Sequence, residues 1–172
     1  VFAALSGAFA VAMLDGRGEA VLAIDRMGTH PLCYSETGDM LVFGSTLDSI
    51  SAHSANPPKI DRQAIYDYVY FHMVPGPRTI HVGRHRLLPG SLLHWRNGKA
   101  EVRTYWEMRF AEHETRPLPV LKNDFLAVLR EGVREASRDG TVGAFLSGGT
   151  DSSTIAGMLG QVTGQPARTY SI

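Results

Sequence analysis

The chain lacks the residues that would indicate secretion, a cysteine-based metal site or a membrane span. Cys33 is the only cysteine among 172 residues, so no intrachain disulfide can form. No apolar run approaches the ~20 residues of a membrane-spanning helix, and residues 1–12 carry no basic start of a secretory signal. These absences predict a protein that works in the reducing cytoplasm and has no membrane partner.

An excess of positive charge is also missing. Lys and Arg together number 17, Asp and Glu also number 17, and 44% of the residues are hydrophobic. Proteins that bind nucleic acid usually carry clustered basic residues, so nucleic acid is not an expected partner. None of the seven histidines falls in a His-Glu-x-x-His motif. We interpret them as core or surface residues rather than metal ligands.

One stretch, Phe145-Leu146-Ser147-Gly148-Gly149-Thr150-Asp151-Ser152-Ser153, combines residue types and flanks that predict a specific chemistry. Before it, residues 141–146 form a short apolar run suited to a buried parallel strand. After it, residues 152–162 have helical spacing, with Ile155, Met158, Leu159 and Val162 predicted to face inward. The stretch therefore joins a strand to a helix N-terminus, where unpaired backbone N–H groups and the positive end of the helix dipole favour an anion.

The side chains of this loop suit a phosphate. Gly148 and Gly149 let the backbone approach an anion closely, and Asp151 can hold a divalent cation that bridges phosphate oxygens. Hydroxyl donors come from Ser147, Ser152 and Ser153. The alternative is an ordinary turn with an Asp cap. The loop has neither the lysine of a Walker loop nor dinucleotide-fingerprint spacing, but its Ser-Gly-Gly-x-Asp-Ser pattern resembles the pyrophosphate loop of the N-type ATP pyrophosphatases.

Short strands separated by turn residues dominate the first part of the chain. We expect them at 7–14, 20–24, 31–34, 40–43, 91–96 and 99–106, the last two joined by the turn Asn97-Gly98. Two helices are expected between them, at 45–54 with Ser45 as its cap and at 62–73 with Asp61 as its cap. The second of these carries a stripe of Ile65, Tyr68, Val69 and His72. A sheet of these strands alone would leave one apolar face exposed to water. We therefore expect that residues upstream of Val1 form a further layer.

The second part has the pattern of a parallel α/β unit. A helix is predicted at 120–137, ended by Asp139-Gly140, followed by parallel strands at 142–146 and 168–172. The polar, proline-bounded residues 113–119 read as a linker. The sequence thus predicts a mixed fold class, α+β followed by α/β, with domains at 1–112 and 120–172.

Four sets of residues resemble the glutamine-dependent asparagine synthetase family, in which a class II glutamine amidotransferase domain precedes an N-type ATP pyrophosphatase domain. They are Leu5-x-Gly7-x-Phe9-Ala10-x-Ala12-x-x-Asp15, Asp25-Arg26-x-Gly28-x-x-Pro31-Leu32-x-Tyr34, Leu88-Pro89-Gly90 with its hairpin and Tyr105, and the 147–153 loop. The resemblance implies the end of an Ntn-type, β-rich glutaminase domain followed by the start of a parallel α/β adenine-nucleotide domain.

The resemblance also implies site residues. Ser147, Gly148, Gly149, Asp151, Ser152 and Ser153 would hold the pyrophosphate of ATP, with Asp151 near Mg²⁺, and Phe145, Leu146 and Ile172 would lie beside the adenosine. In such enzymes the β-carboxylate of aspartate attacks the α-phosphorus of ATP. Ammonia released from glutamine then displaces AMP from the acyl-adenylate.

Some positions depart from the family pattern. The family's nucleophile is an N-terminal cysteine, and it is expected upstream of Val1; Cys33 reads as a buried packing residue, so no catalytic residue is assigned here. Thr46 stands where the family often has glutamate, and Thr150 stands where it usually has leucine. A β-lactam-synthetase-like or a peptide- or polysaccharide-modifying enzyme, and a fragment without turnover, remain open alternatives. A homodimer also remains open.

Overall fold

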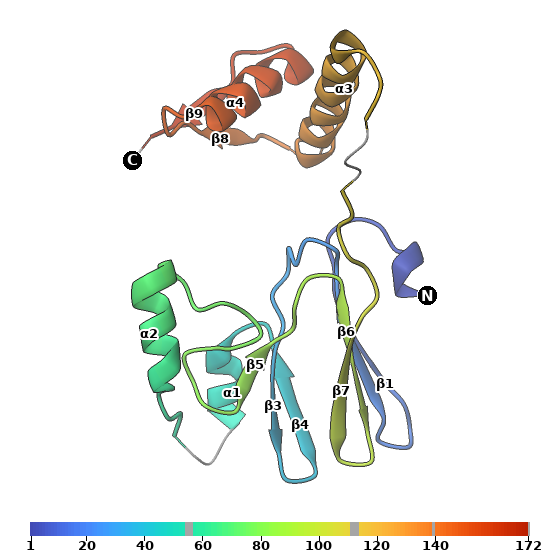
Figure 1. Cartoon of the computed structure of the whole chain (residues 1–172), viewed down its shortest axis with the longest axis vertical. Coiled ribbons are helices and arrows are strands. Elements are labelled where there is room, and N and C mark those ends of the chain that lie inside the picture. Colours follow the sequence, from blue (N-terminus) through green and yellow to red (C-terminus); the bar gives the residue numbers. More distant parts are fainter. Residues whose placement is uncertain (54–56, 111–113, 139, 172) are drawn as a thin grey trace. The chain divides into compact units, whose positions relative to one another are not determined.

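Two compact units make up the chain. The computed structural model describes residues 1–53, 57–110, 114–138 and 140–171 (Figure 1). Contacts divide the chain into Val1–Arg109 and Phe110–Ile172. The first unit has two antiparallel sheets, and the second has a parallel strand pair with helices. This confirms the predicted mixed fold class.

The larger sheet of the first unit has the strand order β1-β2-β6-β7, with all neighbours antiparallel. Its strands are β1 (Ala10–Leu14), β2 (Ala20–Ile24), β6 (Ser91–Arg96) and β7 (Lys99–Thr104). The strands predicted at 7–14 and 20–24 pair as the hairpin β1-β2, and those predicted at 91–96 and 99–106 pair as the hairpin β6-β7. The turn between β6 and β7 has φ of 52° at Asn97 and 72° at Gly98, the left-handed conformations that an Asn-Gly hairpin turn requires.

The smaller sheet has the order β4-β3-β5. Its strands are β3 (Cys33–Thr37), β4 (Met40–Gly44) and β5 (Arg84–Arg86). The sequence did not predict β5, because its three residues Arg-His-Arg show no apolar alternation. Leu22, Leu93 and Trp95 from the larger sheet and Tyr34 from the smaller sheet lie in one buried cluster, together with Leu87, which follows β5. The two sheets therefore share a core.

Two helices lie between β4 and β5 in the sequence, α1 (Leu47–His53) and α2 (Arg62–Phe71). The predicted cap of α2 is confirmed, since the Asp61 side chain accepts from the Gln63 amide at 2.9 Å. The predicted Ser45 cap of α1 is wrong: the Thr46 hydroxyl accepts from the Ser49 amide at 3.2 Å. The predicted end of α1, at residue 54, lies outside the described residues.

The second unit contains α3 (Leu118–Ala136), β8 (Gly143–Phe145), α4 (Thr150–Thr163) and β9 (Arg168–Tyr170). The predicted parallel pairing is confirmed, with Gly143 opposite Arg168 and Phe145 opposite Tyr170. Helix α3 begins two residues before the predicted start at 120. Its first turn holds a proline, which a helix tolerates there because that N–H has no intrahelical acceptor. The predicted stop at Asp139 falls outside the described residues.

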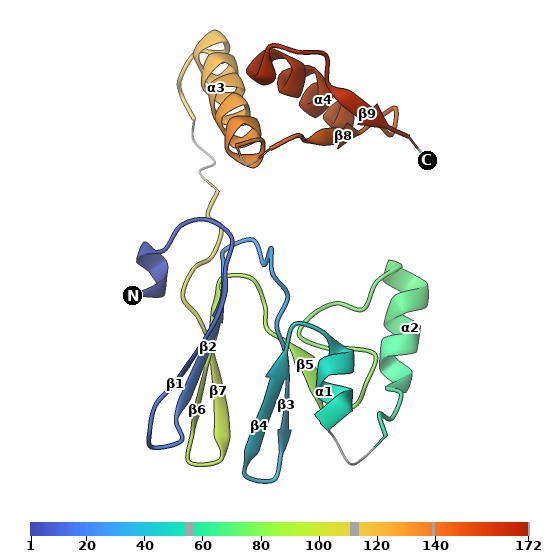
Figure 2. The same cartoon turned by 180° about the vertical axis from the view of Figure 1, so that it is seen from behind.

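The core of the second unit lies between α3, α4 and β8 (Figure 2). Its buried residues are Val133, Ala144, Ala156, Met158 and Leu159. The inward prediction for Met158 and Leu159 is confirmed. Ile155 is 38% exposed, so its predicted inward position is wrong in this chain. Ala156 occupies the buried position next to it.

Candidate functional site

The 147–153 stretch lies at the junction of β8 and α4, as the sequence predicts, but α4 begins at Thr150, two residues before the predicted start at 152. Gly149 is the residue before the first helical turn, and no side chain caps the helix, so the alternative of an Asp-capped turn does not describe this junction. Gly148 has φ of 82° and nothing within 4 Å of the position a Cβ would take. A side chain there would strain the backbone and would also cover the open side of the loop.

Hydroxyl groups hold the loop in shape. The Ser147 amide donates to Ser152 Oγ at 3.2 Å, and the two hydroxyl oxygens lie 3.0 Å apart. The Ser152 and Ser153 hydroxyls both donate to the Gly149 carbonyl, at 3.1 and 2.8 Å. The three predicted serines therefore lie together, and the hydroxyls of all three already have partners within this stretch. Binding an anion through Ser152 would exchange its bond to Gly149 for one to the ligand.

Backbone N–H groups are the strongest donors that remain at this junction. Among the described residues, the amides of Thr150, Asp151 and Ser152 donate to no protein acceptor, while the Ser153 amide already bonds to the Gly149 carbonyl at 3.1 Å. The first amides of any α-helix lack intrahelical acceptors and carry the positive end of its dipole. Asp151 is exposed in the first turn. It therefore belongs to the same helical turn as the three free amides.

The two predicted adenosine residues that the structure describes face different ways. The Phe145 side chain is 73% exposed, whereas Leu146 is half-buried and packs against the core of the second unit. Leu146 can therefore meet a ligand only through its backbone. The third predicted residue, Ile172, lies outside the described residues.

Sequence reasoning missed Ser171. Its hydroxyl donates to the Leu146 carbonyl at 2.9 Å, and the Leu146 amide donates to the Tyr170 carbonyl at 2.8 Å. The carboxyl ends of neighbouring parallel strands meet at one edge of a sheet, which is where α/β folds place ligands. This rule places the end of β9 beside the loop that follows β8. It could therefore have identified Ser171 from the sequence.

In the first unit, Asp25 is the main polar centre. Its carboxylate accepts from the amides of Phe9 at 3.2 Å, Met27 at 2.9 Å and Thr29 at 3.1 Å. Its own carbonyl accepts from the Gly90 amide at 2.9 Å. Asp25 is 3% exposed. Its carboxylate ties the residue before β1 to the 25–29 loop, and its carbonyl ties this loop to the residue before β6.

These bonds determine the protonation of Asp25. Burial by itself would raise its pKa, but the amide hydrogen bonds from Thr29, Met27 and Phe9 and the bond from the Thr29 hydroxyl lower the pKa to about 2. A carboxylate that accepts several N–H bonds is stabilised in its charged form. Asp25 is therefore ionised throughout the ordinary pH range and acts as a structural acceptor.

Cys33 lies in β3 and is 2% exposed. Burial raises the pKa of its thiol, against the opposing charge and hydrogen bond of Arg86. A buried, protonated thiol is a poor nucleophile. The prediction of a buried packing cysteine is confirmed.

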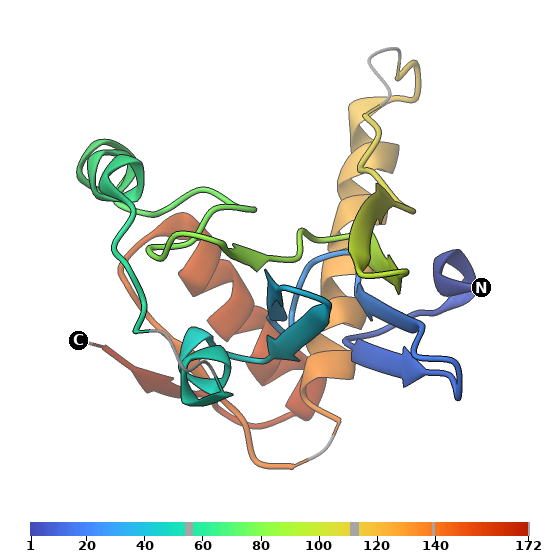
Figure 3. The same cartoon turned by 90° about the horizontal axis from the view of Figure 1, so that it is seen from below.

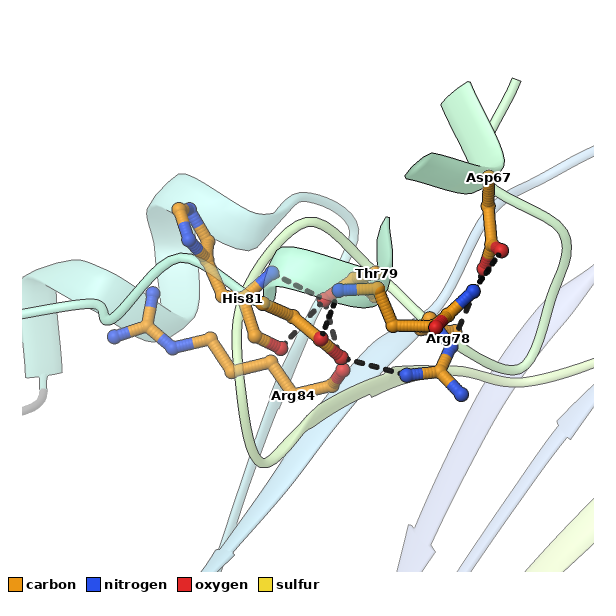
Figure 4. A network of polar contacts seen from close by, with 7 residues as sticks. Asp67, Arg78, Thr79, His81 and Arg84 are labelled. Carbon is orange, nitrogen blue, oxygen red and sulfur yellow. Dashed lines mark hydrogen bonds and ion pairs between the residues drawn. The ribbon is translucent and has the colours of Figure 1, made fainter. Parts of the chain in front are cut away.

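A second polar network ties α2 to the 78–84 segment (Figure 4). Arg78 pairs with Asp61 at 2.7 Å and with Asp67 at 3.5 Å. The Thr79 hydroxyl donates to the Arg84 carbonyl at 2.8 Å. His81 Nδ1 is buried and has no partner among the described residues. Burial, followed by the charge of Arg84, lowers the pKa of His81.

Metal binding by histidine has no support in this part of the chain. His81 and His85 are four residues apart, but neither lies on a helix, because His81 precedes β5 and His85 lies within it. The centroid of the His85 ring is 5.3 Å from that of the Tyr34 ring. Within the described ranges, no group of three or more His, Cys, Asp or Glu side chains could hold a metal ion.

None of the described helices is long and apolar enough to cross a membrane.

Comparison with known proteins gives matches along most of the chain. Residues 1–106 match the family model of the glutamine amidotransferase domain, and residues 124–172 match that of asparagine synthase. The chain is similar to the glutamine-hydrolyzing asparagine synthetase 1 of Bacillus subtilis (strain 168), with 32% identity over 154 residues, 88% of this chain and 24% of that protein.

Two further relatives show the spread of the similarity. The glutamine-hydrolyzing asparagine synthetase 3 of the same organism is 29% identical over 175 residues, 98% of this chain and 28% of that protein. Amidase chyE of Penicillium rubens is 29% identical over 167 residues, 94% of this chain and 24% of that protein. The chain thus spans about a quarter of the length of these relatives.

Proposed function

Because this chain belongs to the glutamine amidotransferase family and continues into an asparagine synthase segment, we propose that its parent is an ATP-dependent, glutamine-hydrolysing enzyme that forms amides from carboxylates. Aspartate is the proposed acceptor and asparagine the product. We place this activity in the cytoplasm.

The observation that carries the proposal is the loop between β8 and α4. It combines a glycine in the left-handed conformation, three amides with free N–H groups among the described residues and a helix N-terminus. These groups favour a phosphate or pyrophosphate over a neutral ligand. In the proposed enzyme the pyrophosphate of ATP rests on this loop, and the adenosine lies along the backbone of residues 145 and 146.

The proposed amide formation requires a site that stabilises the departing pyrophosphate. A carboxylate becomes an acyl donor only when one of its oxygens is made into a good leaving group. In the proposed reaction the β-carboxylate of aspartate attacks the α-phosphorus of ATP, forming β-aspartyl-AMP and releasing pyrophosphate. Ammonia from glutamine then attacks the acyl carbon and AMP departs. The loop amides would stabilise negative charge on the departing pyrophosphate, which lowers the barrier electrostatically.

Asp151 would hold the magnesium ion that accompanies ATP. Mg²⁺ is bound by one or two carboxylates together with substrate phosphates and water. A single exposed carboxylate beside a phosphate loop fits that pattern, and the ion would neutralise phosphate charge. The role of this chain's own residue is to bring one carboxylate within reach of the phosphates.

A second candidate function differs only in the acceptor. The similarity to Amidase chyE is nearly as extensive as that to the asparagine synthetases, so a parent that activates another small-molecule or peptide carboxylate is the alternative. Amide formation by the parent with aspartate, compared with other carboxylates, would distinguish the two. Both candidates use the same loop.

Titration calorimetry of the 172-residue chain with ATP tests the shared step. We expect Asp151→Asn to weaken ATP binding about tenfold when Mg²⁺ is present, which corresponds to ~1.4 kcal/mol, and to have little effect in EDTA. Asp124→Asn, an exposed aspartate on α3 paired with Arg116, is the matched control. Equal affinities of Asp151→Asn and the unsubstituted chain in Mg²⁺ would show that Asp151 holds no ion, and absence of ATP binding in both would contradict the loop assignment.

A further inference from the structure

Leu146 is held at three points where the parallel strands β8 and β9 end. Its side chain packs against the core of the second unit. Its amide donates to the Tyr170 carbonyl at 2.8 Å, and its carbonyl accepts from the Ser171 hydroxyl at 2.9 Å. The last of these bonds is unusual, because parallel strands are normally joined by backbone N–H groups. Here a side chain supplies the donor, so the bond depends on which residue stands at position 171.

Ser171 is the residue that follows β9, which Figure 3 shows as the dark red strand nearest the C-terminal end of the chain. It lies 25 residues after Leu146 in the sequence, and the parallel pairing of β8 with β9 brings the two together. Because Ser171 is exposed, its side chain contributes little buried area. Ser171 therefore acts on the end of β8 through its hydrogen bond rather than through packing.

The Leu146 carbonyl and the Ser147 amide belong to one planar peptide unit. The carbonyl end of this unit accepts from the Ser171 hydroxyl, and its amide end donates to Ser152 Oγ at 3.2 Å. One hydroxyl from the end of β9 and one from the first turn of α4 thus fix the same peptide plane from its two ends. A rotation of this plane would break both bonds at once.

This peptide plane determines how the chain enters the 147–153 loop. Two glycines follow Ser147, and the first of them, Gly148, has φ of 82°. Glycine restricts backbone rotation less than any other residue. Without the two bonds on the peptide plane, the stretch between Leu146 and α4 would sample more conformations, and an anion would have to select one of them on binding. Ordering the plane beforehand lowers that entropic cost.

We propose that Ser171 is a positioning residue for the phosphate groups of the nucleotide. By holding the 146–147 peptide plane, together with Ser152, it keeps the 147–153 loop in the shape that receives them. This role rests on the proposed function, in which the loop receives the pyrophosphate of ATP. It requires the hydroxyl of Ser171 and no contact between Ser171 and the ligand.

Two substitutions of nearly the same shape test the need for the hydroxyl by titration calorimetry of the 172-residue chain. Ser171→Thr keeps the donor and should bind ATP with Mg²⁺ within about twofold of the unsubstituted chain. Ser171→Val lacks the donor and should bind ATP roughly fivefold more weakly, the loss expected for one hydrogen bond. Inorganic pyrophosphate should show the same loss, because the effect is on the loop. The matched control is Thr169→Val, at an exposed residue of β9, which should bind both ligands like the unsubstituted chain.

A double-substitution cycle tests whether Ser171 and Ser152 act on the same peptide plane. If Ser171→Ala costs about fivefold and Ser152→Ala about tenfold, independent effects would multiply to about fiftyfold in the double variant. We expect the double variant to lose only about tenfold, because a plane released at one end is no longer fixed by the bond at the other. Ser153→Ala is the control partner, since its hydroxyl bonds to the Gly149 carbonyl instead. Its effect should multiply with that of Ser171→Ala.

The outcomes separate this role from the proposed function. If Ser171→Val binds ATP and pyrophosphate as tightly as Ser171→Thr does, Ser171 has no positioning role, and the proposed function stands. A loss confined to ATP would also overturn the role, because the hydroxyl would then serve the nucleoside and not the loop. Fully multiplying effects of Ser171→Ala and Ser152→Ala would contradict a shared peptide plane. If the unsubstituted chain binds neither ligand, the proposed function fails, and the role of Ser171 fails with it.

Discussion

Ser147 and Ser152 close the loop between β8 and α4, with the Ser147 amide 3.2 Å from Ser152 Oγ and the two hydroxyl oxygens 3.0 Å apart. This pair connects the loop, two residues after the end of the strand, to the first turn of the helix. It therefore keeps the intervening glycines in an open arc before any ligand binds. A preformed loop loses less conformational entropy on binding.

Removing the Ser152 hydroxyl should open this loop. We expect Ser152→Ala to weaken ATP binding about tenfold, because the hydroxyl both positions the Ser147 amide and can donate to phosphate, and each such bond contributes ~1 kcal/mol. Thr154→Ala is the control: its hydroxyl bonds back to the Thr150 carbonyl within the helix at 2.7 Å and should not affect ATP. Equal losses in both variants, measured by calorimetry, would assign the effect to helix stability instead.

Asp25 should be critical for the folding of the first unit. Asp25→Asn replaces one acceptor oxygen by a donor that faces the amides of Phe9, Met27 and Thr29, and we expect a loss of about 2–3 kcal/mol in the free energy of unfolding. Urea denaturation followed by tryptophan fluorescence measures it. The exposed Asp39→Asn is the control and should stay within about 0.5 kcal/mol of the unsubstituted chain.

The same carboxylate predicts an acid limit. The pKa of Asp25 is about 2 in the fold, below the ordinary value near 3.9 of an unfolded chain. Its stabilising contribution is therefore complete above about pH 4 and is lost as the pH falls toward 2. The unfolding free energy should decline across this window in the unsubstituted chain and decline less in Asp25→Asn. Parallel profiles for the two proteins would contradict this account.

His81 predicts a second pH effect with the same direction at higher pH. Burial and Arg84 lower its pKa in the fold, so the unfolded chain binds a proton more readily. The contribution of neutral His81 to the free energy of unfolding is complete above about pH 6.5. It falls as the pH drops below the pKa that His81 has in the unfolded chain. His81→Gln should flatten the unfolding profile between about pH 5 and 7. His53→Gln, an exposed position on α1, should leave it unchanged.

Cys33 should be inert toward glutamine and toward thiol reagents in the folded chain. It is internal to β3, buried, and its thiol pKa is raised. Incubation of the 172-residue chain with glutamine should release no glutamate above the level of a Cys33→Ala variant, and a thiol-reactive dye should label Cys33 only in denaturant. Glutamate release that disappears in Cys33→Ala would overturn this assignment.

Several features of the fold follow from residues close together in the chain. Asn97-Gly98 determines a hairpin because both positions need the left-handed region, and the side chain of Asp61 caps α2 through the amide two residues on. The junction of β8 and α4 belongs to this class, since a strand, two glycines and a helix start are adjacent in sequence. Local steric and hydrogen-bonding rules suffice for such elements.

Other features depended on contacts between distant residues. β2 pairs with β6, about seventy residues later, and the polar triplet of β5 becomes a strand only because β3 offers its edge. Ser171 reaches the Leu146 carbonyl only through the parallel pairing of β8 and β9.

The sequence by itself determined where the glycine-rich junction between β8 and α4 lies and which residue types form it, because those signals are local. The tertiary structure decided which groups remain free to act. Ser152 is partly engaged within the loop, Cys33 is enclosed by strands, and the apolar stripe of α2 faces outward because Arg78 binds the opposite side of the helix at Asp67. Spacing along a helix identifies an apolar face, but only the placement of distant charged partners determines whether that face is buried or exposed.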